Sequence, residues 1–318
     1  MTRKTRRFIF YAFLFVFLII VPMIVFYASG YSFDWEKKTL VATGGIYLKS
    51  LPSRAEIYID NKPKGSTAKL IKHLLPKIYE ISVIKDGYYP WKKNLTAEPQ
   101  LVTKAKNILL VPFNPKISLV ATGSEVYDQF ADREENNPYF IYGSNLYRTR
   151  DLKLLVKSIA NYVIYKDGII YLDNATGKIF ELDLTTLKSA QMFDQVFPSL
   201  NKGKWIMSND NKKLLCQKDK SVEILWLDEF TANSVLRRKG DIEKIDFGEK
   251  INQVIWYPRT DEHLIVAGEN SIIITELDSR PPRNSNTFIT TENPKILYDF
   301  NNKILYFSSQ NKIYQTEI

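Results

Sequence analysis

Apolar residues form one long uninterrupted run near the start of this chain and short, broken runs in the rest of it. Residues 8–27 read FIFYAFLFVFLIIVPMIVFY and include no charged side chain. Twenty residues of α-helix rise about 30 Å, the thickness of the hydrocarbon core of a bilayer. One charge at the middle of such a helix would cost about 3 kcal/mol. The run therefore predicts a transmembrane helix, and Pro22 is acceptable within it because membrane helices tolerate a lost hydrogen bond.

Charged residues on either side of the run predict its orientation. Four basic residues precede it: Arg3, Lys4, Arg6 and Arg7. Only Lys37 and Lys38 follow it closely. Basic flanks stay on the cytoplasmic side of a membrane. We therefore expect residues 1–35 to be a cytoplasmic basic head with a membrane anchor, in a single-pass protein whose bulk lies outside the cytoplasm.

A cleaved secretory signal peptide is the alternative interpretation of this segment. Residues 28–30 are Ala-Ser-Gly, which offers small residues at the spacing a signal peptidase accepts, and cleavage there would leave Tyr31 at the N-terminus. The apolar run is longer than the 7–15 residues usual in a signal peptide. Tyr27, Tyr31 and Trp35 also fall where aromatic residues gather at a membrane interface. Both observations favour a retained anchor.

Beyond the anchor, residues 45–111 alternate apolar and polar positions in short runs that are separated by turn residues. Residues 78–84, IYEISVI, show this alternation most cleanly, and Asp86-Gly87 follows them. Runs of this length and period are typical of antiparallel strands. About seven strands fit into this segment, which predicts a small antiparallel β-sandwich in residues 36–115. The one helix candidate is the stretch around residues 70–75.

Four short motifs in this segment occur in the order and spacing of a known family. They are SLPSRAEIYID at 50–60, GST at 65–67, LLPK at 74–77, and KDGY at 85–88 followed by Trp91. Together they resemble a PEGA domain. The resemblance implies a β-sandwich of prokaryotic surface proteins without catalytic residues. It implies structural roles for the matching positions, which are Pro52, Ala55, Asp60, Gly65, Thr67, Gly87, Tyr88 and Trp91.

Three positions depart from the family pattern, and all three lie in turns. Arg54 stands where the family has glycine, Ala68 where it has a second proline, and Lys77 where it has the turn glycine. Glycine at such positions usually permits a positive φ. We expect these departures to cost strain without changing the fold.

A longer repeat begins near residue 117. The segments 178–183, 224–228 and 273–278 each end in Leu-Asp, and the leucines Leu182, Leu227 and Leu277 are 45 and 50 residues apart. A hairpin pattern precedes each segment, the final unit follows residue 295, and a degenerate first unit covers residues 139–148. Repeats of 40–50 residues with three or four short strands are typical of propeller blades. Residues 116–318 are therefore expected to form a β-propeller of about five blades. The segment loosely resembles WD-repeat-like and related bacterial propellers, although the chain has no Gly-His or Trp-Asp pair. An irregular sandwich or an incomplete propeller is the alternative.

Charge and cysteine content narrow the candidate partners and the cellular compartment of the protein. The net charge of +9 is concentrated in residues 36–115, where basic residues outnumber acidic ones by more than two to one, whereas residues 116–318 are slightly acidic. Lys37, Lys38, Lys92 and Lys93 are candidate contacts for anionic lipid headgroups or acidic wall polymer; a solvated lysine surface is the alternative. Outside the cytoplasm, nucleic acid is not an expected partner. The single cysteine, Cys216, excludes an intramolecular disulfide and favours a bacterial envelope.

The search for catalytic residues gives no constellation. The two histidines, His73 and His263, stand in different modules, with no cysteine or acid cluster at the spacing of metal ligands. Acidic residues cluster at 132–135, 241–246 and 261–262, and solvated turns account for them better than the paired carboxylates of a glycosidase. Residues 173–177, DNATG, lack the later glutamate of a calcium loop and fit a hairpin turn. No cofactor or metal is expected.

Three functions remain open at this point. The first is a membrane-anchored envelope protein that binds or scaffolds a partner, without catalytic activity; its partners would be the bilayer through residues 8–27 and anionic lipid, wall polymer or another envelope protein. The second is a structural envelope component without a discrete ligand. The third is a propeller-type hydrolase, which a central cavity lined with converging acids would favour.

Overall fold

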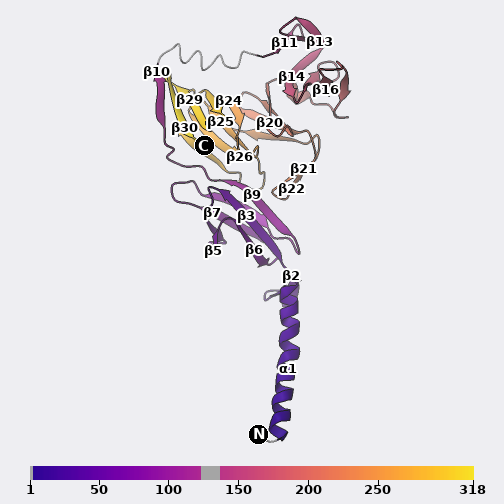
Figure 1. Ribbon diagram of the computed structural model, residues 1–318, viewed down its shortest axis with the longest axis vertical. Coiled ribbons are helices and arrows are strands. Elements are labelled where there is room, and N and C mark those ends of the chain that lie inside the picture. The colour runs from indigo at the N-terminus through magenta and orange to yellow at the C-terminus, as the bar shows by residue number, and fades with distance from the viewer. Residues whose placement is uncertain (1–2, 123–136) are drawn as a thin grey trace. The chain divides into compact units, whose positions relative to one another are not determined.

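The computed structural model describes residues 3–122 and 137–318 (Figure 1). It contains one long helix, α1 (Arg3–Ala28), and is otherwise almost entirely β-structure. No residue of α1 is buried, and its length and composition suit a membrane span or a signal sequence. The chain divides into two compact units. The first comprises residues 1–86, 90–110 and 280–282, and the second comprises residues 87–89, 111–279 and 283–318.

A two-stranded hairpin follows the helix in the first unit. Strand β1 (Tyr31–Asp34) pairs with β2 (Thr39–Ala42), with Phe33 opposite Leu40. We will call β1, β2 and their turn the juxtamembrane hairpin. Tyr31 and Trp35 were expected to be interfacial aromatics, but these strands were not predicted, because each is only four residues long.

Seven further strands complete the first unit, in two sheets. One sheet has the order β6-β3-β9 and the other β5-β4-β7-β8. Their bounds are β3 (Gly44–Leu51), β4 (Glu56–Ile59), β5 (Lys62–Ser66), β6 (Lys69–Leu74), β7 (Ile78–Ile84), β8 (Trp91–Thr96) and β9 (Val102–Leu109). Buried aliphatic side chains from both sheets, among them Ile46, Ile57 and Ile81, form the core.

Two local features of this unit differ from the expectation. Strand β6 occupies the stretch that was a helix candidate, and its Ile71 and Leu74 are buried while Lys72 is exposed. Strand β9 pairs with β3 in parallel, so the sheets are not wholly antiparallel. The paired residues of β3 and β9 are more than fifty positions apart in the chain, and a local pattern of apolar residues carries no information on such a pairing.

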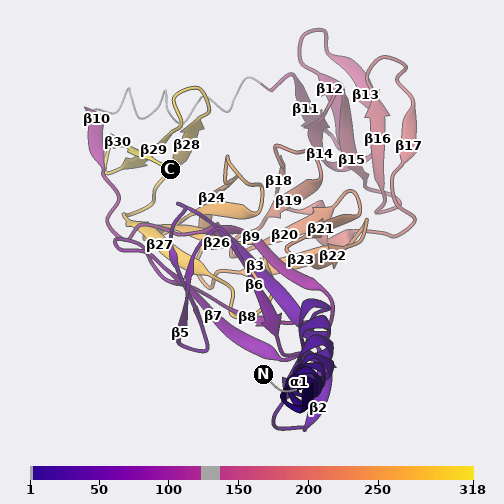
Figure 2. The same cartoon turned by 60° about the horizontal axis from the view of Figure 1, so that its bottom comes forward.

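The second unit consists of successive antiparallel sheets in chain order (Figure 2). The first described sheet is β11-β12-β13 (Tyr139–Tyr142, Asn145–Arg148, Lys153–Val156). Next is β14-β15-β16-β17 (Ile159–Tyr165, Gly168–Asp173, Ile179–Asp183, Ser189–Gln191), followed by β18-β19-β20-β23 (Lys204–Met207, Lys213–Gln217, Ser221–Trp226, Ile242–Asp246) and β24-β25-β26-β27 (Ile251–Trp256, His263–Gly268, Ser271–Glu276, Ser285–Thr290). Each is a meander in which neighbours in sequence are neighbours in the sheet, apart from an inserted hairpin, β21 (Phe230–Ala232) with β22 (Val235–Arg237).

The last sheet brings together the two ends of this unit. Strand β10 (Ser118–Thr122) pairs with β30 (Lys312–Glu317), which continues to β29 (Ile304–Ser309) and β28 (Ile296–Asp299). An early strand that completes the last sheet is the closure found in propellers. The described residues of the second unit thus contain five sheets of three or four strands, as predicted for the blades. Leu182, Leu227 and Leu277 all lie at the ends of third strands and are buried.

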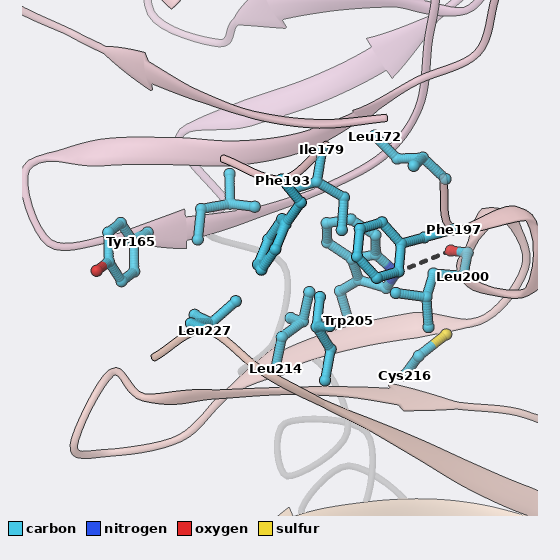
Figure 3. Close-up of a cluster of buried hydrophobic side chains, with 12 residues drawn as sticks. Tyr165, Leu172, Ile179, Phe193, Phe197, Leu200, Trp205, Leu214, Cys216 and Leu227 are labelled. Carbon is cyan, nitrogen blue, oxygen red and sulfur yellow. Dashed lines mark hydrogen bonds between the residues drawn. The ribbon is translucent and has the colours of Figure 1, made fainter. Parts of the chain in front are cut away.

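Neighbouring sheets of the second unit pack through apolar clusters. Figure 3 shows the cluster between the β14–β17 sheet and the β18–β23 sheet, where Phe193, Phe197 and Trp205 lie among aliphatic side chains. The Trp205 Nε1 donates a hydrogen bond of 2.9 Å to the Leu200 carbonyl, at the 3₁₀ helix η1 (Pro198–Asn201). Cys216 is buried in the same cluster, as expected for a structural cysteine, and this burial raises the pKa of its thiol.

Candidate functional site

Backbone hydrogen bonds fix the juxtamembrane hairpin to the end of α1. Gly30 adopts a positive φ of 82°, which lets the chain turn out of the helix. Its N–H donates to the Tyr27 carbonyl at 3.0 Å. Its carbonyl accepts both the N–H of Thr43 at 2.8 Å and the hydroxyl of Thr43 at 2.7 Å. The base of the hairpin is therefore closed directly against the last turn of the helix.

The tip of the hairpin is organised by one carboxylate. Asp34 is buried, and its Oδ1 accepts the N–H of Glu36 at 2.9 Å and that of Lys37 at 3.2 Å. Short acidic side chains commonly stabilise turns in this way. With Asp34 engaged by the backbone, Lys37 and Lys38 are left exposed at the tip.

Aromatic contacts connect α1 to the two β-elements nearest to it. The ring of Phe26 meets that of Tyr31 edge-on at 6.1 Å, and the ring of Tyr27 stacks on that of His73 at 4.1 Å with an interplanar angle of 11°. His73 belongs to β6, so the end of the helix contacts both the hairpin and the first sheet. His73 therefore has a packing role, which no local pattern of residues could predict.

Of the four lysines proposed to contact an anionic surface, three are exposed and one is not. Lys37, Lys38 and Lys92 are exposed, the first two on the hairpin tip and the third on β8. Lys93 is wholly buried. Its Nζ donates a hydrogen bond to the Arg280 carbonyl at 2.8 Å and lies 5.8 Å from the centre of the Trp91 ring. The expectation for Lys93 is therefore wrong. The alternation along β8 puts Lys93 on the same buried face as Trp91, and this signal was present in the sequence.

The positions that match the PEGA motif have structural contacts. The hydroxyl of Thr67 lies 2.6 Å from that of Ser50 and accepts the N–H of Ala55 at 3.1 Å. Ala55 is fully buried, and the Pro52 carbonyl accepts the Ser50 hydroxyl at 2.7 Å. These bonds hold the turn between β3 and β4 against the turn between β5 and β6, which contains Thr67.

The next turn of the motif is stabilised by Asp60. Its carboxylate accepts the N–H of Glu80 at 3.1 Å and pairs with the Nζ of Lys77, also at 3.1 Å. The hydrogen bond from Lys77 to Asp60 raises the pKa of the lysine. Lys77 thus replaces the family's turn glycine with a side chain that holds the neighbouring turn.

Positive φ angles explain why glycine occurs at two positions of the motif, and they are kept where Arg54 replaces a glycine. Gly65 and Gly87 have φ values of 103° and 85°. Arg54 has a φ of 58°, which is the strain expected of a side chain at a position where the family has glycine. Trp91 is buried in the first unit, whereas Tyr88 is half-buried and forms an isolated β-bridge with Pro112 in the second unit.

A buried ion network in the second unit was not predicted. The Nζ of Lys213 lies 3.2 Å from Asp210 and 3.3 Å from Glu262, and its side chain is 1% exposed. Burial disfavours the ionised form of both acids. For Asp210, the effect of burial is outweighed by the hydrogen bond from Ser208 and the charge of Lys213, which lower its pKa. For Glu262, burial is the larger effect and raises its pKa.

The acidic clusters in this unit are therefore not simply solvated turns. Asp261 and Glu262 are buried, and Asp261 accepts the N–H of Asn209 and that of Asp210. Glu243 is paired with Arg237 and with Arg283. The expectation of solvation fails for Asp261, Glu262 and Glu243, because each of these carboxylates meets donors from other turns or strands. Asp241 and Asp246 are exposed, as expected. The cluster at 132–135 lies outside the described residues.

Little in the described residues resembles a catalytic centre. Within residues 3–122 and 137–318, no group of three His, Cys, Asp or Glu side chains could hold a metal ion. His263 bonds Thr260 through Nδ1 at 2.9 Å, far along the chain from His73. A pocket of about 590 Å³ in the second unit is lined mainly by residues 112–118 and 315–317. Its charged lining residues, Lys116 and Glu317, do not form the acid pair of a glycosidase.

Comparison with known families gives one match. The model of the PEGA domain matches residues 43–109. These residues form a PEGA domain. The match covers β3 to β9, which are the strands of the two sheets in the first unit.

Comparisons with whole proteins are more remote. No curated protein matches the chain. Among solved structures it is similar to the extracellular domain of a protein described as a hybrid two-component system from B. thetaiotaomicron, with 9% identity, a TM-score of 0.34, and coverage of 90% of this chain and 31% of that one. It is also similar to an oligogalacturonate lyase in complex with manganese (12%, TM-score 0.39, 54% and 55%) and to the AfRom2 CNH domain (11%, 0.34, 81% and 68%). The chain thus spans about a third of the first of these proteins and about half of the second. The description of the second unit as propeller-like rests on its own strand order.

Proposed function

We propose that this chain is a single-pass membrane protein that presents a PEGA domain and a propeller-like domain outside the cytoplasm to bind or scaffold an envelope partner. The observation that carries the proposal is that no residue of α1 is buried. A run of twenty apolar residues with so little protein cover is unfavourable in water, because each large apolar side chain contributes about 1.5–3 kcal/mol when it is removed from water. A bilayer supplies that cover, and the basic residues before the helix favour a cytoplasmic N-terminus.

The exposed lysines support an anionic partner for the first unit. Lys37, Lys38 and Lys92 extend into solvent, and each basic side chain close to an anionic surface contributes about 1 kcal/mol. Such attraction weakens within roughly 10 Å at physiological salt. Lipid headgroups and acidic wall polymer offer the same chemistry to these side chains.

A binding role accounts for the acids of the second unit better than hydrolysis does. A glycosidase requires one carboxylic acid and one carboxylate that face a common cleft. The acids Glu243 and Glu262 are instead occupied by Arg237, Arg283 and Lys213. We therefore infer a non-catalytic protein in which this network stabilises the propeller-like domain.

Cysteine labelling in intact cells tests the topology. Cys216 is buried and gives little background, so reactive positions can be introduced one at a time. Asn302→Cys, in an exposed turn, should react with a membrane-impermeant maleimide in intact cells, whereas Thr5→Cys should react only after permeabilisation. The reversed pattern would contradict the proposed orientation. A mature N-terminus at Tyr31 would show that the anchor is removed.

A further inference from the structure

One face of the juxtamembrane hairpin is apolar along its whole length. Directly opposed residues of an antiparallel pair share a face, so Tyr31 with Ala42 and Phe33 with Leu40 form this face. Trp35 continues it, since its ring meets that of Phe33 at 4.8 Å. The opposite face carries the pairs Ser32 with Val41 and Asp34 with Thr39.

This apolar face is exposed. Trp35 is 82% exposed, Leu40 54% and Phe33 40%. The hairpin is a separate two-stranded sheet and joins neither sheet of the PEGA domain. Because an isolated two-stranded hairpin is only marginally stable in water, an additional surface against this face would stabilise it.

The contacts at the base of the hairpin indicate which surface this is. Tyr31 lies on the apolar face and meets Phe26, a residue of the uncharged run of α1. Phe26 is only two residues, about 3 Å of helix rise, from the end of α1 at Ala28. The apolar face therefore begins beside the terminal turn of the apolar helix, at the depth where a bilayer would end.

The tip of the hairpin complements this placement. Lys37 and Lys38 are exposed there, while Asp34 is engaged by the backbone. Tryptophan is enriched at the boundary between headgroups and acyl chains. Lysine can bury its aliphatic stem there and keep its ammonium group among the headgroups.

We propose that the juxtamembrane hairpin lies in the membrane interface at the outer end of α1, with Phe33, Trp35 and Leu40 at the level of the upper acyl chains and Lys37 and Lys38 against anionic headgroups. The proposal rests on α1 being a retained anchor. The hairpin thereby holds the adjoining PEGA domain at the bilayer surface, because Thr43 leads from β2 directly into β3.

Tryptophan fluorescence provides a direct measurement on the full-length chain. The chain has five tryptophans, and the other four, Trp91, Trp205, Trp226 and Trp256, are buried. The protein would be reconstituted in vesicles of phosphatidylcholine and phosphatidylglycerol whose lipids carry bromine at a shallow or a deep acyl position. Wild type minus Trp35→Phe isolates the emission of Trp35. Bromine at the shallow position should quench most of this difference, and bromine at the deep position clearly less.

A second pair of variants tests the face. Phe33→Ser combined with Leu40→Ser should make Trp35 several-fold more accessible to aqueous acrylamide. Val41→Ser, on the opposite face, should leave its accessibility unchanged. Equal effects of the two changes would overturn the proposal.

Resistance to extraction by alkaline carbonate tests the membrane anchor separately from the interfacial hairpin. A protein that resists extraction but whose Trp35 is not quenched by brominated lipid would overturn the interfacial hairpin and leave the anchor standing. A protein that is extracted would overturn the anchor itself. Shielding of Trp35 that depends on protein concentration and not on brominated lipid would show that a second copy covers the face, and would also overturn the proposal.

Discussion

In the described part of the chain, two hairpins stand apart from the larger sheets, and they differ in what lies against their apolar residues. In the hairpin β21–β22, Phe230 packs on the buried cluster around Trp256 and lies 5.0 Å from the Nζ of Lys213. Opposite Phe230, Arg237 lies over the Trp226 ring and pairs with Glu243. The juxtamembrane hairpin has no such support, and its Trp35 and Leu40 are exposed. The same local structure is thus held by the domain in one place and, as proposed, by lipid in the other.

The largest expected effect is at the buried ion network of Lys213, Asp210 and Glu262, on which Phe230 of β21–β22 packs through Lys213. Lys213→Ala would leave Glu262 buried without its cation, and removing one partner of a buried pair costs about 3–5 kcal/mol. The free energy of unfolding of the second unit should fall by this amount in chemical denaturation. Lys212→Ala, next to it and exposed, is the matched control and should cost under about 1 kcal/mol. Similar losses in the two variants would show that the ion network does not support the hairpin.

Phenylalanine truncation separates the two hairpins directly. Phe230→Ala removes an aromatic ring that is packed against a core and should lower the free energy of unfolding by about 2 kcal/mol. Phe33→Ala should change this quantity by less than about 0.5 kcal/mol, because its ring is exposed to a large extent. It should instead reduce the quenching of Trp35 by brominated lipid. If Phe33→Ala destabilises the chain as much as Phe230→Ala, the contrast between the hairpins is lost.

The contribution of this ion network to stability should also depend on pH. Burial raises the pKa of Glu262 in the folded chain above its ordinary value of 4.5. The folded state then holds the proton more tightly than the unfolded state, so this contribution to stability is present at low pH and is lost as the pH rises above about 4.5. Groups remote from this network titrate alike in wild type and in Glu262→Gln, so the comparison isolates the network around Glu262. The melting temperature of wild type relative to this variant should therefore decrease between pH 4.5 and pH 7, and a constant or increasing difference would contradict the assignment.

The smallest expected effect is in the turn of β21–β22. Ser234 has a φ of 64°, a conformation that costs a residue with a side chain up to about 1 kcal/mol more than glycine. Ser234→Gly should raise the free energy of unfolding by a few tenths of a kcal/mol up to this value. The turn of the juxtamembrane hairpin offers the counterpart, Lys38→Gly, at a φ of 51°. That change should relieve similar strain but weaken binding to anionic vesicles, so the two substitutions should differ in their second readout.

The repeat in the second unit could be predicted because each blade contains its own pattern. Leu182, Leu227 and Leu277 close equivalent strands, and strands that pair with their neighbours in sequence leave a local signal. The PEGA domain was predictable for a similar reason, since its turns require particular residues. Arg54 shows that even a departure from the motif keeps the positive φ of the turn.

Long-range contacts account for what the sequence did not reveal. Glu262 is buried because Lys213 reaches it from a strand some fifty residues earlier, and the pairing of β9 with β3 joins residues equally distant. Lys93 is a different case. Its position between Trp91 and Leu95 on an alternating strand marked it as inward-facing, but the net charge of the module suggested otherwise. Strand period is the better guide for a lysine in a sandwich.

The pairing of β10 with β30 has a consequence for how the second unit is assembled during synthesis. Ser118 faces Gln315, so the partner of β10 follows roughly 200 positions later in the chain, and contacts of such separation form slowly. Until β30 has been made, β10 remains a strand without a neighbour, and unpaired strand edges promote aggregation. A chain that stalls within the last sheet would therefore carry an open edge that proteases and chaperones could recognise. Pairing of β30 with β10 closes this edge and completes the last sheet.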